Sequence, residues 1–398
     1  MFSVSKRINN IIESPTMKVA AEAKGMQARG EHVIDLSVGE PDFPTPRNIK
    51  DAAIEAIEKN MTRYTVNPGT VELRKAIQNK FKNDHNLEYT LNEIIVSNGA
   101  KQSIFNAVQS IIYVDDEAII PSPYWVSYPE MITLAHGKPV IVETSEENGF
   151  KITPEQLKNA VTPATKLLIL CNPSNPTGSA YTKEELKAIA EVAEEHDFYI
   201  ISDEIYEKLI YDNFKFVSFA ELNESMKKRT IIINGVSKAF AMTGWRIGYA
   251  AGPENIIKGI NKLQSHSTSN ASSISQAATV EALNGTQEIV EEMRLEFEKR
   301  RNYFYDAITS LDGITCYKPE GAFYLFPNIR HYFGKSTEVM KIEHSFDLSM
   351  YLLYEAKVAT VPGSSFGAEG FLRLSYATSM ENLIEGFERI KKALAKLK

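Results

Sequence analysis

Short apolar runs alternate with amphipathic segments through the middle of the chain. Seven of these runs have the length of a strand and the apolar character of strands in a parallel sheet. They cover residues 93–97, 117–121, 139–143, 166–171, 198–202, 230–234 and 247–251. Helical patterns separate them, and in one of these, 183–196, Leu186, Ile189, Ala190 and Ala193 share one face. This alternation predicts a doubly wound α/β sheet.

The pattern changes after about residue 290. A long charged helix is predicted from residue 289 to about 311, and a final amphipathic helix at 380–397. Four short strands are predicted between these helices, at 314–317, 322–326, 358–361 and 371–376. Together these segments predict a second, smaller α+β layer.

Composition narrows the class of protein. The chain of 398 residues allows a large core and about two domains. Its net charge of −7 argues against a nucleic-acid-binding surface. The sequence contains no apolar stretch of membrane-spanning length, no secretory signal and no zinc-type motif. We therefore expect no nucleic-acid, membrane or metal partner. Cys171 and Cys316 lack a paired spacing, which predicts reduced thiols and a cytoplasmic location.

The most informative chemistry lies at residues 235–248, which read Gly-Val-Ser-Lys-Ala-Phe-Ala-Met-Thr-Gly-Trp-Arg-Ile-Gly. Lys238 follows the strand at 230–234, and ligands of open α/β sheets bind at that carboxyl edge. A lysine amine can bond to an aldehyde cofactor, and the guanidinium of Arg246 suits a phosphate. The alternative, a solvated lysine and a surface arginine, fits less well with the apolar strand that precedes them.

Two other strand ends carry candidate residues. Residues 99–101 open a helix after a strand, where backbone N–H groups can bind a phosphate, although such a turn can also be merely structural. Asp203 and Glu204 follow another strand, and either could simply cap a helix. A carboxylate there could instead keep a pyridine nitrogen protonated, because an opposite charge favours the charged form.

The stretch 235–248 resembles the cofactor attachment site of the class-I aminotransferases, which are pyridoxal phosphate enzymes of fold type I. Similarity extends from Gly-Glu-Pro-Asp-Phe at 39–43 to Arg-Leu-Ser-Tyr at 373–376, and is closest to a bacterial aspartate aminotransferase subgroup. The resemblance implies a large cofactor-binding domain, residues 48–290, with a mostly parallel seven-stranded sheet between helices. It also implies a discontinuous small domain, residues 1–47 and 291–398, and a homodimer whose active sites are shared at the interface.

The resemblance assigns roles to individual residues. The implied catalytic residues are Lys238, Asp203 and Tyr206. The residues implied to bind pyridoxal 5'-phosphate are Gly99, Ala100, Lys101, Trp125, Asn175, Asp203, Tyr206, Ser237, Lys238, Arg246 and, from the neighbouring subunit, Tyr64. The residues implied to bind substrate are Gly39, Trp125, Asn175 and Arg373. Arg373 would bind the α-carboxylate in a bidentate manner, and an internal ion pair is the structural alternative. Asn270 would reach across the interface as Tyr64 does, and the bond before Pro176 is expected to be cis.

The implied reaction moves the amino group of L-aspartate to 2-oxoglutarate in a ping-pong cycle, forming oxaloacetate and L-glutamate. Alternatives of the same fold are aminotransferases for aromatic, alanine or prephenate substrates and a carbon–sulfur lyase. A regulatory protein that keeps such a domain as a sensor would carry an added DNA-binding segment, and the short, weakly basic stretch before Gly39 argues against it.

The partner of the distal substrate carboxylate is not assigned by the sequence. Animal-type enzymes use an arginine shortly before the position of Ser269, and residues 264–266 contain none. The candidates are Ser14, Thr16, Lys18 and Lys101. Prephenate carries an extra carboxylate, and residues 12–13 lack the basic side chain expected for it, which favours aspartate.

Overall fold

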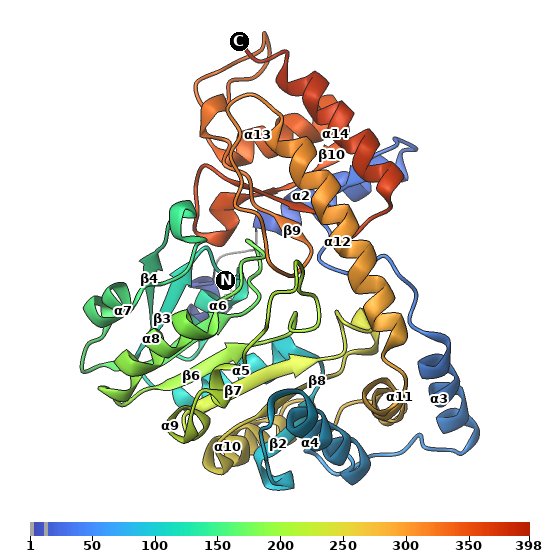
Figure 1. Cartoon of the computed structure of the whole chain (residues 1–398), viewed down its shortest axis with the longest axis vertical. Coiled ribbons are helices and arrows are strands. Elements are labelled where there is room, and N and C mark those ends of the chain that lie inside the picture. The colour runs from blue at the N-terminus through green and yellow to red at the C-terminus, as the bar shows by residue number, and fades with distance from the viewer. Residues whose placement is uncertain (1–3, 12–14) are drawn as a thin grey trace.

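A seven-stranded sheet forms the centre of the molecule (Figure 1). The computed structural model describes residues 4–11 and 15–398. The strands are β2 (Ile94–Ser97), β3 (Glu117–Ser122), β4 (Lys138–Glu143), β5 (Thr165–Cys171), β6 (Tyr199–Asp203), β7 (Thr230–Gly235) and β8 (Gly248–Ala251). Their order is β2-β8-β7-β6-β5-β3-β4, and all neighbours are parallel except at β8, which is antiparallel to β2 and β7. The predicted α/β sheet is confirmed, and each strand end lies within one residue of its predicted position.

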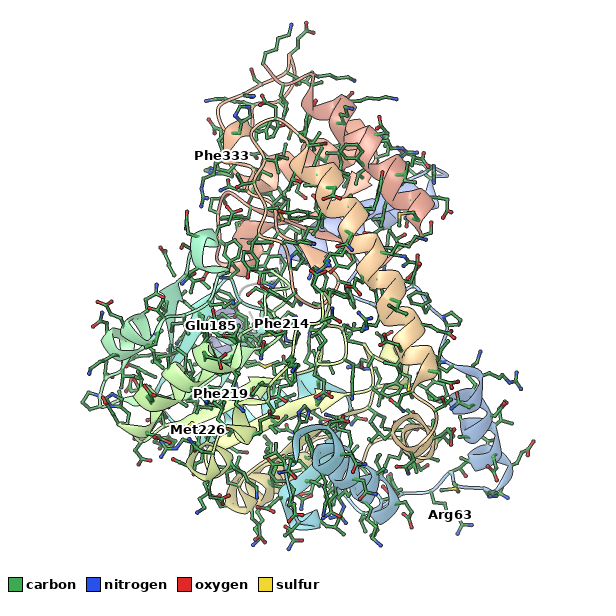
Figure 2. The ribbon with its side chains drawn as sticks, in the orientation of Figure 1. Arg63, Glu185, Phe214, Phe219, Met226 and Phe333 are labelled. Carbon is green, nitrogen blue, oxygen red and sulfur yellow. The ribbon has the colours of Figure 1, made fainter. Side chains whose placement is uncertain are left out.

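Helices cover both faces of the sheet because successive strand residues point to opposite sides. Ile231 and Ile233 of β7 pack with α5, α6 and α10, whereas Ile232 packs with α4 and α11. Helices α7, α8 and α9 cover the rest of the face on which α4 and α11 lie. Figure 2 labels Phe219 and Met226, which belong to the core beneath them. The bounds are α3 (Arg47–Glu58), α4 (Val71–His85), α5 (Ala100–Ile111), α6 (Ser127–Leu134), α7 (Pro154–Ala160), α8 (Lys183–Glu194), α9 (Glu224–Lys227), α10 (Glu254–Ser265) and α11 (Ser273–Asn284).

A second group of elements lies beyond the carboxyl edge of the sheet, at the top of Figure 1. It comprises α2 (Pro15–Ala28), β1 (Ile34–Asp35), α12 (Glu288–Thr309), β9 (Tyr324–Leu325), α13 (Ser345–Tyr351), β10 (Val358–Ala359), β11 (Val361–Pro362), β12 (Leu372–Ser375) and α14 (Met380–Leu394). Strand β1 pairs in parallel with β10, and Val19 and Ala23 of α2 share a core with Leu353. The segment before the large sheet therefore packs with the last third of the chain.

Three predicted elements of this group differ from the structure. The single strand predicted at 358–361 is two short strands, β10 and β11, which belong to different sheets. Residues 314–317 form no strand, because Thr315 makes only a single bridge, to Asn328. The last helix ends at Leu394 rather than at residue 397, since Lys398 turns back and exchanges backbone hydrogen bonds with Ser336. In the described part of the chain, helices are too short or too polar to cross a membrane. A short helix, α1 (Lys6–Asn9), precedes α2.

Candidate active site

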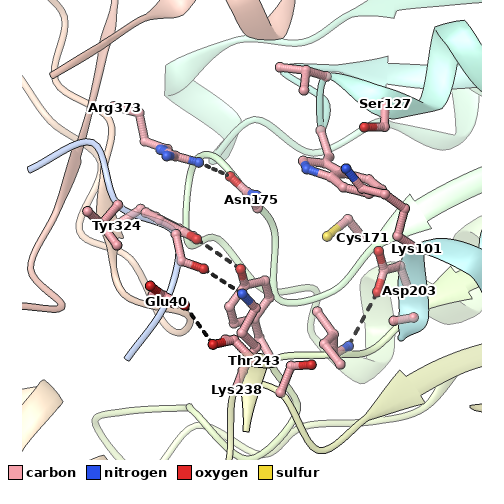
Figure 3. A pocket seen from close by; sticks show the side chains of 18 of the residues that line it. Glu40, Lys101, Ser127, Cys171, Asn175, Asp203, Lys238, Thr243, Tyr324 and Arg373 are labelled. Atoms are coloured by element: carbon pink, nitrogen blue, oxygen red, sulfur yellow. Dashed lines mark hydrogen bonds between the residues drawn. The ribbon is translucent and has the colours of Figure 1, made fainter. Parts of the chain in front are cut away.

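A cavity of about 550 Å³ lies between the carboxyl ends of the parallel strands and the second group of elements (Figure 3). Loops after β5, β6 and β7 reach it from below, and residues 37–40 and β12 reach it from the other side. The predicted residues that line it are Gly39, Ala100, Lys101, Trp125, Asn175, Asp203, Tyr206, Ser237, Lys238, Arg246 and Arg373. Gly99 adjoins this set through Ala100, whereas Tyr64 lies elsewhere.

Lys238 projects into the cavity from the loop that joins β7 to β8. Its amine donates a hydrogen bond to the Gly39 carbonyl (Figure 3). Burial, together with the positive charges of Arg373 and Arg246, lowers the pKa of Lys238 to about 8, and the negative charges of Glu40 and Asp203 oppose this shift. At pH 7 about a tenth of this amine is therefore neutral, far more than for an ordinary lysine, and the neutral form is the one that reacts with an aldehyde.

Asp203 and Glu204, which the sequence could not tell apart, point to different places. Asp203 lines the cavity and accepts a hydrogen bond of 2.6 Å from the Tyr128 hydroxyl. Burial raises the pKa of Asp203 to about 6, although the hydrogen bond from Tyr128 and the charge of Lys238 oppose that rise. Glu204 faces away and accepts hydrogen bonds from Ser202 and Ser218. Only Asp203 is placed to meet a group bound beside Lys238.

An anion can be bound where α5 and β8 begin. The first N–H groups of a helix lack intrahelical partners, and Gly99 offers no side chain to cap them. Gly99 has a φ of +86°, and a Cβ added there would lie 2.3 Å from Arg246 Nη2, so the guanidinium occupies the space that a side chain would fill. This combination of a helix N-terminus and a guanidinium suits a phosphate.

Arg373 is buried in the opposite wall of the cavity. Its Nη1 donates to Asn175 Oδ1 at 3.0 Å and its Nη2 donates to the Ser37 carbonyl at 2.7 Å (Figure 3). Among the described residues, no carboxylate forms an ion pair with it, and its Nε has no hydrogen-bond partner. The structural alternative, an internal ion pair, is therefore wrong for the described chain. A buried guanidinium without a counter-ion favours a carboxylate ligand.

Other expectations fall outside this cavity. Tyr64 is 92% exposed and lines a separate surface hollow with Asn270. Ser14 lies outside the described residues, as does the side chain of Thr16, and Lys18 is exposed. The expected cis bond before Pro176 is wrong. The cis bonds of the described chain precede Pro123 and Pro173, whereas Pro176 lies inside a turn that is closed by hydrogen bonds from the Gly178 N–H to the Ser174 carbonyl and from the Ser174 N–H to the Ser179 carbonyl.

Several cavity residues were not predicted. Tyr128 lies three residues after Trp125, the residue of this segment to which the resemblance assigns a role, and its hydroxyl donates a hydrogen bond to Asp203. Tyr324 sits in an apolar strand, and Glu40 accepts a 2.6 Å hydrogen bond from Thr243 across a separation of about 200 residues. No local signal marks Tyr324, and Glu40 lies in the motif at 39–43 without an assigned role, because the contacts of both residues arise only when distant segments meet.

Comparisons with known proteins agree with this geometry. A family profile described as aminotransferase class I and II matches residues 31–390. The aspartate aminotransferase of Bacillus subtilis (strain 168) is 51% identical over 393 residues, which is 99% of each chain. A protein of Rickettsia bellii (strain RML369-C) named probable aspartate/prephenate aminotransferase is 49% identical, and 100% of both chains is covered. The crystal structure of the aspartate aminotransferase from Rhizobium meliloti superposes over 100% of both chains with a TM-score of 0.97 and 45% identity.

Proposed function

The chain belongs to the class I and II aminotransferase family, and from this premise we propose that it transfers the amino group of L-aspartate to 2-oxoglutarate with pyridoxal 5'-phosphate as cofactor. The observation that carries the proposal is one cavity in which the Lys238 amine lies between a buried carboxylate, Asp203, and a buried guanidinium, Arg373. The relatives named aspartate aminotransferase, at about half identity over the whole chain, support the choice of donor.

The residues of the cavity fit pyridoxal phosphate. The start of α5 and Arg246 would hold the phosphate, and Lys238 would carry the aldehyde carbon. Asp203 would meet the ring nitrogen, with Tyr128 fixing its orientation. Trp125 would stack on the ring, and Tyr206 and Asn175 would contact its phenolic oxygen.

The reaction then follows from what these residues hold and move. When bound, the cofactor withdraws the electrons left at the substrate Cα as its proton departs. Arg373 and Asn175 bind the α-carboxylate and orient the Cα–H bond. The neutral Lys238 Nζ takes the Cα proton, which its pKa of about 8 allows near neutral pH. Asp203 would be ionised beside a protonated ring nitrogen, and its negative charge would keep that nitrogen protonated.

The distal carboxylate of aspartate separates the candidate substrates. Of the described candidates, Lys101 lines the cavity, and its Nζ lies 4.8 Å from the centroid of the Trp125 ring. We assign Lys101 to that carboxylate. Prephenate is the second candidate substrate, because the Rickettsia bellii relative is named for both activities. The residues that argued against prephenate in the sequence include Ile12 and Glu13, which lie outside the described chain.

We also propose that two copies of the chain form a dimer. Within each chain, we propose a large domain, residues 48–290, and a small domain made of residues 1–47 and 291–398. Tyr64, Ile57, Met61 and Val66 are all exposed on α3 and the loop that follows it. Figure 2 labels Arg63 at the outer rim of the molecule, far from the cavity in the same chain. An exposed apolar surface of this kind favours burial against a second copy, where Tyr64 would reach the partner's phosphate site.

Substitution of Lys238 tests the proposed chemistry. With pyridoxal phosphate bound, wild-type protein should form glutamate from aspartate and 2-oxoglutarate, and the cofactor should absorb visible light as it does when joined to a lysine. Lys238→Ala should lose the visible absorbance, and its turnover should fall by at least about a thousandfold, because the same Nζ is proposed to carry the cofactor and to move the proton. Lys258→Ala, an exposed lysine on α10, is the control.

The same assay separates the alternatives. Aspartate should support glutamate formation far better than alanine, aromatic amino acids or a sulfur-containing lyase substrate. Prephenate, offered as amino acceptor, decides the second candidate. Cofactor binding without any transamination of aspartate would reject the proposed substrate, and an unchanged spectrum in Lys238→Ala would reject the proposed role of Lys238.

A further inference from the structure

Tyr324 connects the two walls of the cavity. It lies on β9, is fully buried, and lines the cavity beside Arg373 (Figure 3). Its hydroxyl lies 2.9 Å from the Tyr206 hydroxyl, and its ring centroid lies 4.4 Å from the guanidinium carbon of Arg373. A Cβ added to Gly39 would lie 3.3 Å from the same hydroxyl, so the residue that accepts from Lys238 also packs on Tyr324.

In the hydrogen bond between the Tyr324 and Tyr206 hydroxyls, only donation by Tyr324 leaves the Tyr206 proton available to a bound group. Each tyrosine has a single O–H proton. If Tyr324 donates to Tyr206, the Tyr206 proton remains free to point into the cavity, where an acceptor can be bound. Burial raises the pKa of Tyr324 above its ordinary value, so its hydroxyl keeps its proton at neutral pH. Donation into the Tyr206 oxygen also polarises the Tyr206 O–H and makes it a stronger donor.

The ring has a separate use. The face of an aromatic ring attracts a guanidinium, and this attraction is strongest where water is excluded. Tyr324 and Phe366 both present their rings to Arg373, at 4.4 and 5.1 Å. With Asn175 and Ser37 holding its two terminal nitrogens, the guanidinium has a fixed plane and a fixed tilt. A planar carboxylate needs that orientation for two parallel hydrogen bonds.

We propose that Tyr324 is a positioning residue with two separable parts: its hydroxyl orients the Tyr206 O–H toward the cofactor's phenolic oxygen, and its ring orients Arg373 for the substrate α-carboxylate. The inference rests on the proposed function and adds to it a link between cofactor binding and substrate binding. The two parts can be removed one at a time, because Tyr324→Phe deletes the hydroxyl and keeps the ring, whereas Tyr324→Leu deletes both.

The test uses full-length protein and three measurements. They are the affinity of cofactor-free protein for pyridoxal phosphate, the pH midpoint of the bound cofactor's visible absorbance, and kcat and KM for aspartate. Tyr324→Phe should weaken cofactor affinity by about 3- to 10-fold, the range of one buried hydrogen bond. It should also raise the absorbance midpoint, since a weaker donor stabilises the deprotonated cofactor oxygen less. Its KM for aspartate should stay within about twofold of wild type.

Tyr324→Leu should show the same two changes and, in addition, a KM raised by about tenfold or more. Tyr351→Phe is the matched control, because it also deletes one buried hydroxyl, which donates to the Ala393 carbonyl away from the cavity. It should leave the midpoint and KM unchanged. Thermal unfolding of each variant separates a loss of fold from a loss of positioning, and Tyr324→Phe alone tests the hydroxyl if Tyr324→Leu does not fold.

An unchanged absorbance midpoint in Tyr324→Phe would overturn the role of the hydroxyl. An equal rise of KM in Tyr324→Phe and Tyr324→Leu would overturn the role of the ring. A midpoint shift of the same size in Tyr351→Phe would show a general effect of lost packing and would also overturn the proposal. Failure of the proposed function is distinct, because wild-type protein would then bind no pyridoxal phosphate or would not use aspartate.

Discussion

The reactivity of Lys238 depends on which charges face its amine. Burial lowers its pKa to about 8, Arg373 and Arg246 act in the same direction, and Glu40 acts against them. Glu40 is held by Thr243, four residues before the end of the lysine loop, so its charge stays close to the amine. Glu40 therefore raises the pKa of Lys238 and reduces the fraction of its amine that is neutral.

Glu40→Gln should make the amine reactive at lower pH. The folded pKa of Lys238 is below its usual value of 10.5, so the neutral form increases as pH rises through about 8. Removing the negative charge of Glu40 disfavours the protonated form further and moves this midpoint to lower pH, while glutamine can still accept from Thr243. The measurement is the rate at which cofactor-free protein captures pyridoxal phosphate between pH 6 and 9.5.

The control for this change is Glu343→Gln, which removes an exposed carboxylate paired with Lys341. It should leave the rate profile unchanged. The shift in Glu40→Gln should also shrink at high salt, because exposed charges are screened. A midpoint that moves to higher pH would mean that Glu40 does not act through its charge on Lys238.

At the scale of elements, the anion site depends on how closely β8 approaches the start of α5. A Cβ added to Gly248 would lie 2.0 Å from the Ala100 nitrogen and 2.4 Å from the Gly99 carbonyl carbon. Both are backbone atoms, so the helix start itself must move. Gly248→Ala should weaken binding of pyridoxal phosphate by at least about tenfold, or about 1.4 kcal/mol, and should lower the melting temperature.

Gly244→Ala provides the comparison, because Gly244 lies in the loop that leads into β8 and a Cβ there would have open space. Cofactor affinity and melting temperature should be close to wild type. Equal behaviour of the two alanine variants, measured by cofactor titration, would show that the close approach of β8 to α5 has no part in holding the phosphate.

A buried charge cluster joins the end of α4 to the loop after β6. His85 lies 2.7 Å from Glu207 and 3.1 Å from Glu221, and Lys80 pairs with Glu207. Asp84, His85 and Glu207 are close enough to hold a metal ion, yet Lys80 and Lys208 already pair with these carboxylates. We therefore assign the cluster a structural role, as a set of ion pairs beneath the segment that carries Tyr206.

This cluster makes stability depend on pH. Burial, the largest influence, lowers the pKa of His85, but hydrogen bonds and charges from Glu207 and Glu221 outweigh it and raise the pKa to about 9. The folded pKa exceeds the unfolded value of 6.5, so the stabilisation is complete below pH 6.5 and is lost as pH rises through 9. The free energy of unfolding should fall by roughly 2–3 kcal/mol over that range.

His85→Gln should flatten this dependence, because glutamine bears no charge at any pH. Urea unfolding of cofactor-free protein at pH 6, 7.5 and 9 measures it. His266→Gln changes an exposed histidine and should keep the wild-type slope. If His85→Gln also keeps the wild-type slope, the charge of His85 does not stabilise the fold.

The sequence predicted those strands, helices and site residues that short stretches of sequence determine. The seven strands were found because each contains a short apolar run, and all but the edge strand β4 are largely buried. The site residues at strand ends, such as Asp203 and Lys238, were found because the carboxyl edge of a parallel sheet is one place in space. Tyr324 and Glu40 could not be found in this way, since their contacts join residues more than 100 positions apart. The role of Tyr64 remains a prediction, because it depends on a second chain.

At the scale of the whole molecule, a segment near the beginning of the chain, residues 34–40, meets a segment near its end, residues 358–373, at the cavity. The pairing of β1 with β10 brings residues 37–40 beside Arg373, and the Ser37 carbonyl accepts from its guanidinium. Gly39 meanwhile accepts from Lys238 on the large sheet. The proposed site of the substrate carboxylate, the Lys238 amine and the contact between the two groups of elements therefore all involve residues 37–40. Any movement of one group relative to the other must alter the access to Lys238.

The proposed dimer makes a prediction that a single chain cannot satisfy. If Tyr64 completes the partner's site, a Lys238→Ala chain and a Tyr64→Ala chain can complement each other. In a mixed dimer, one site lacks both groups, while the other has Lys238 from one chain and Tyr64 from its partner. Random assembly makes half of the dimers mixed, so about a quarter of the wild-type activity should return at limiting cofactor.

Co-expression of the two chains with different affinity tags, followed by purification on both, isolates the mixed dimer for the measurement. Its activity should then be about half that of wild type, because one of its two sites is intact. Co-expression of Lys238→Ala with a Lys258→Ala chain sets the value for a dimer with one intact lysine and both tyrosines. If the Tyr64→Ala mixture shows only the mean of its two parents, each chain completes its own site, and the exposed position of Tyr64 has another cause.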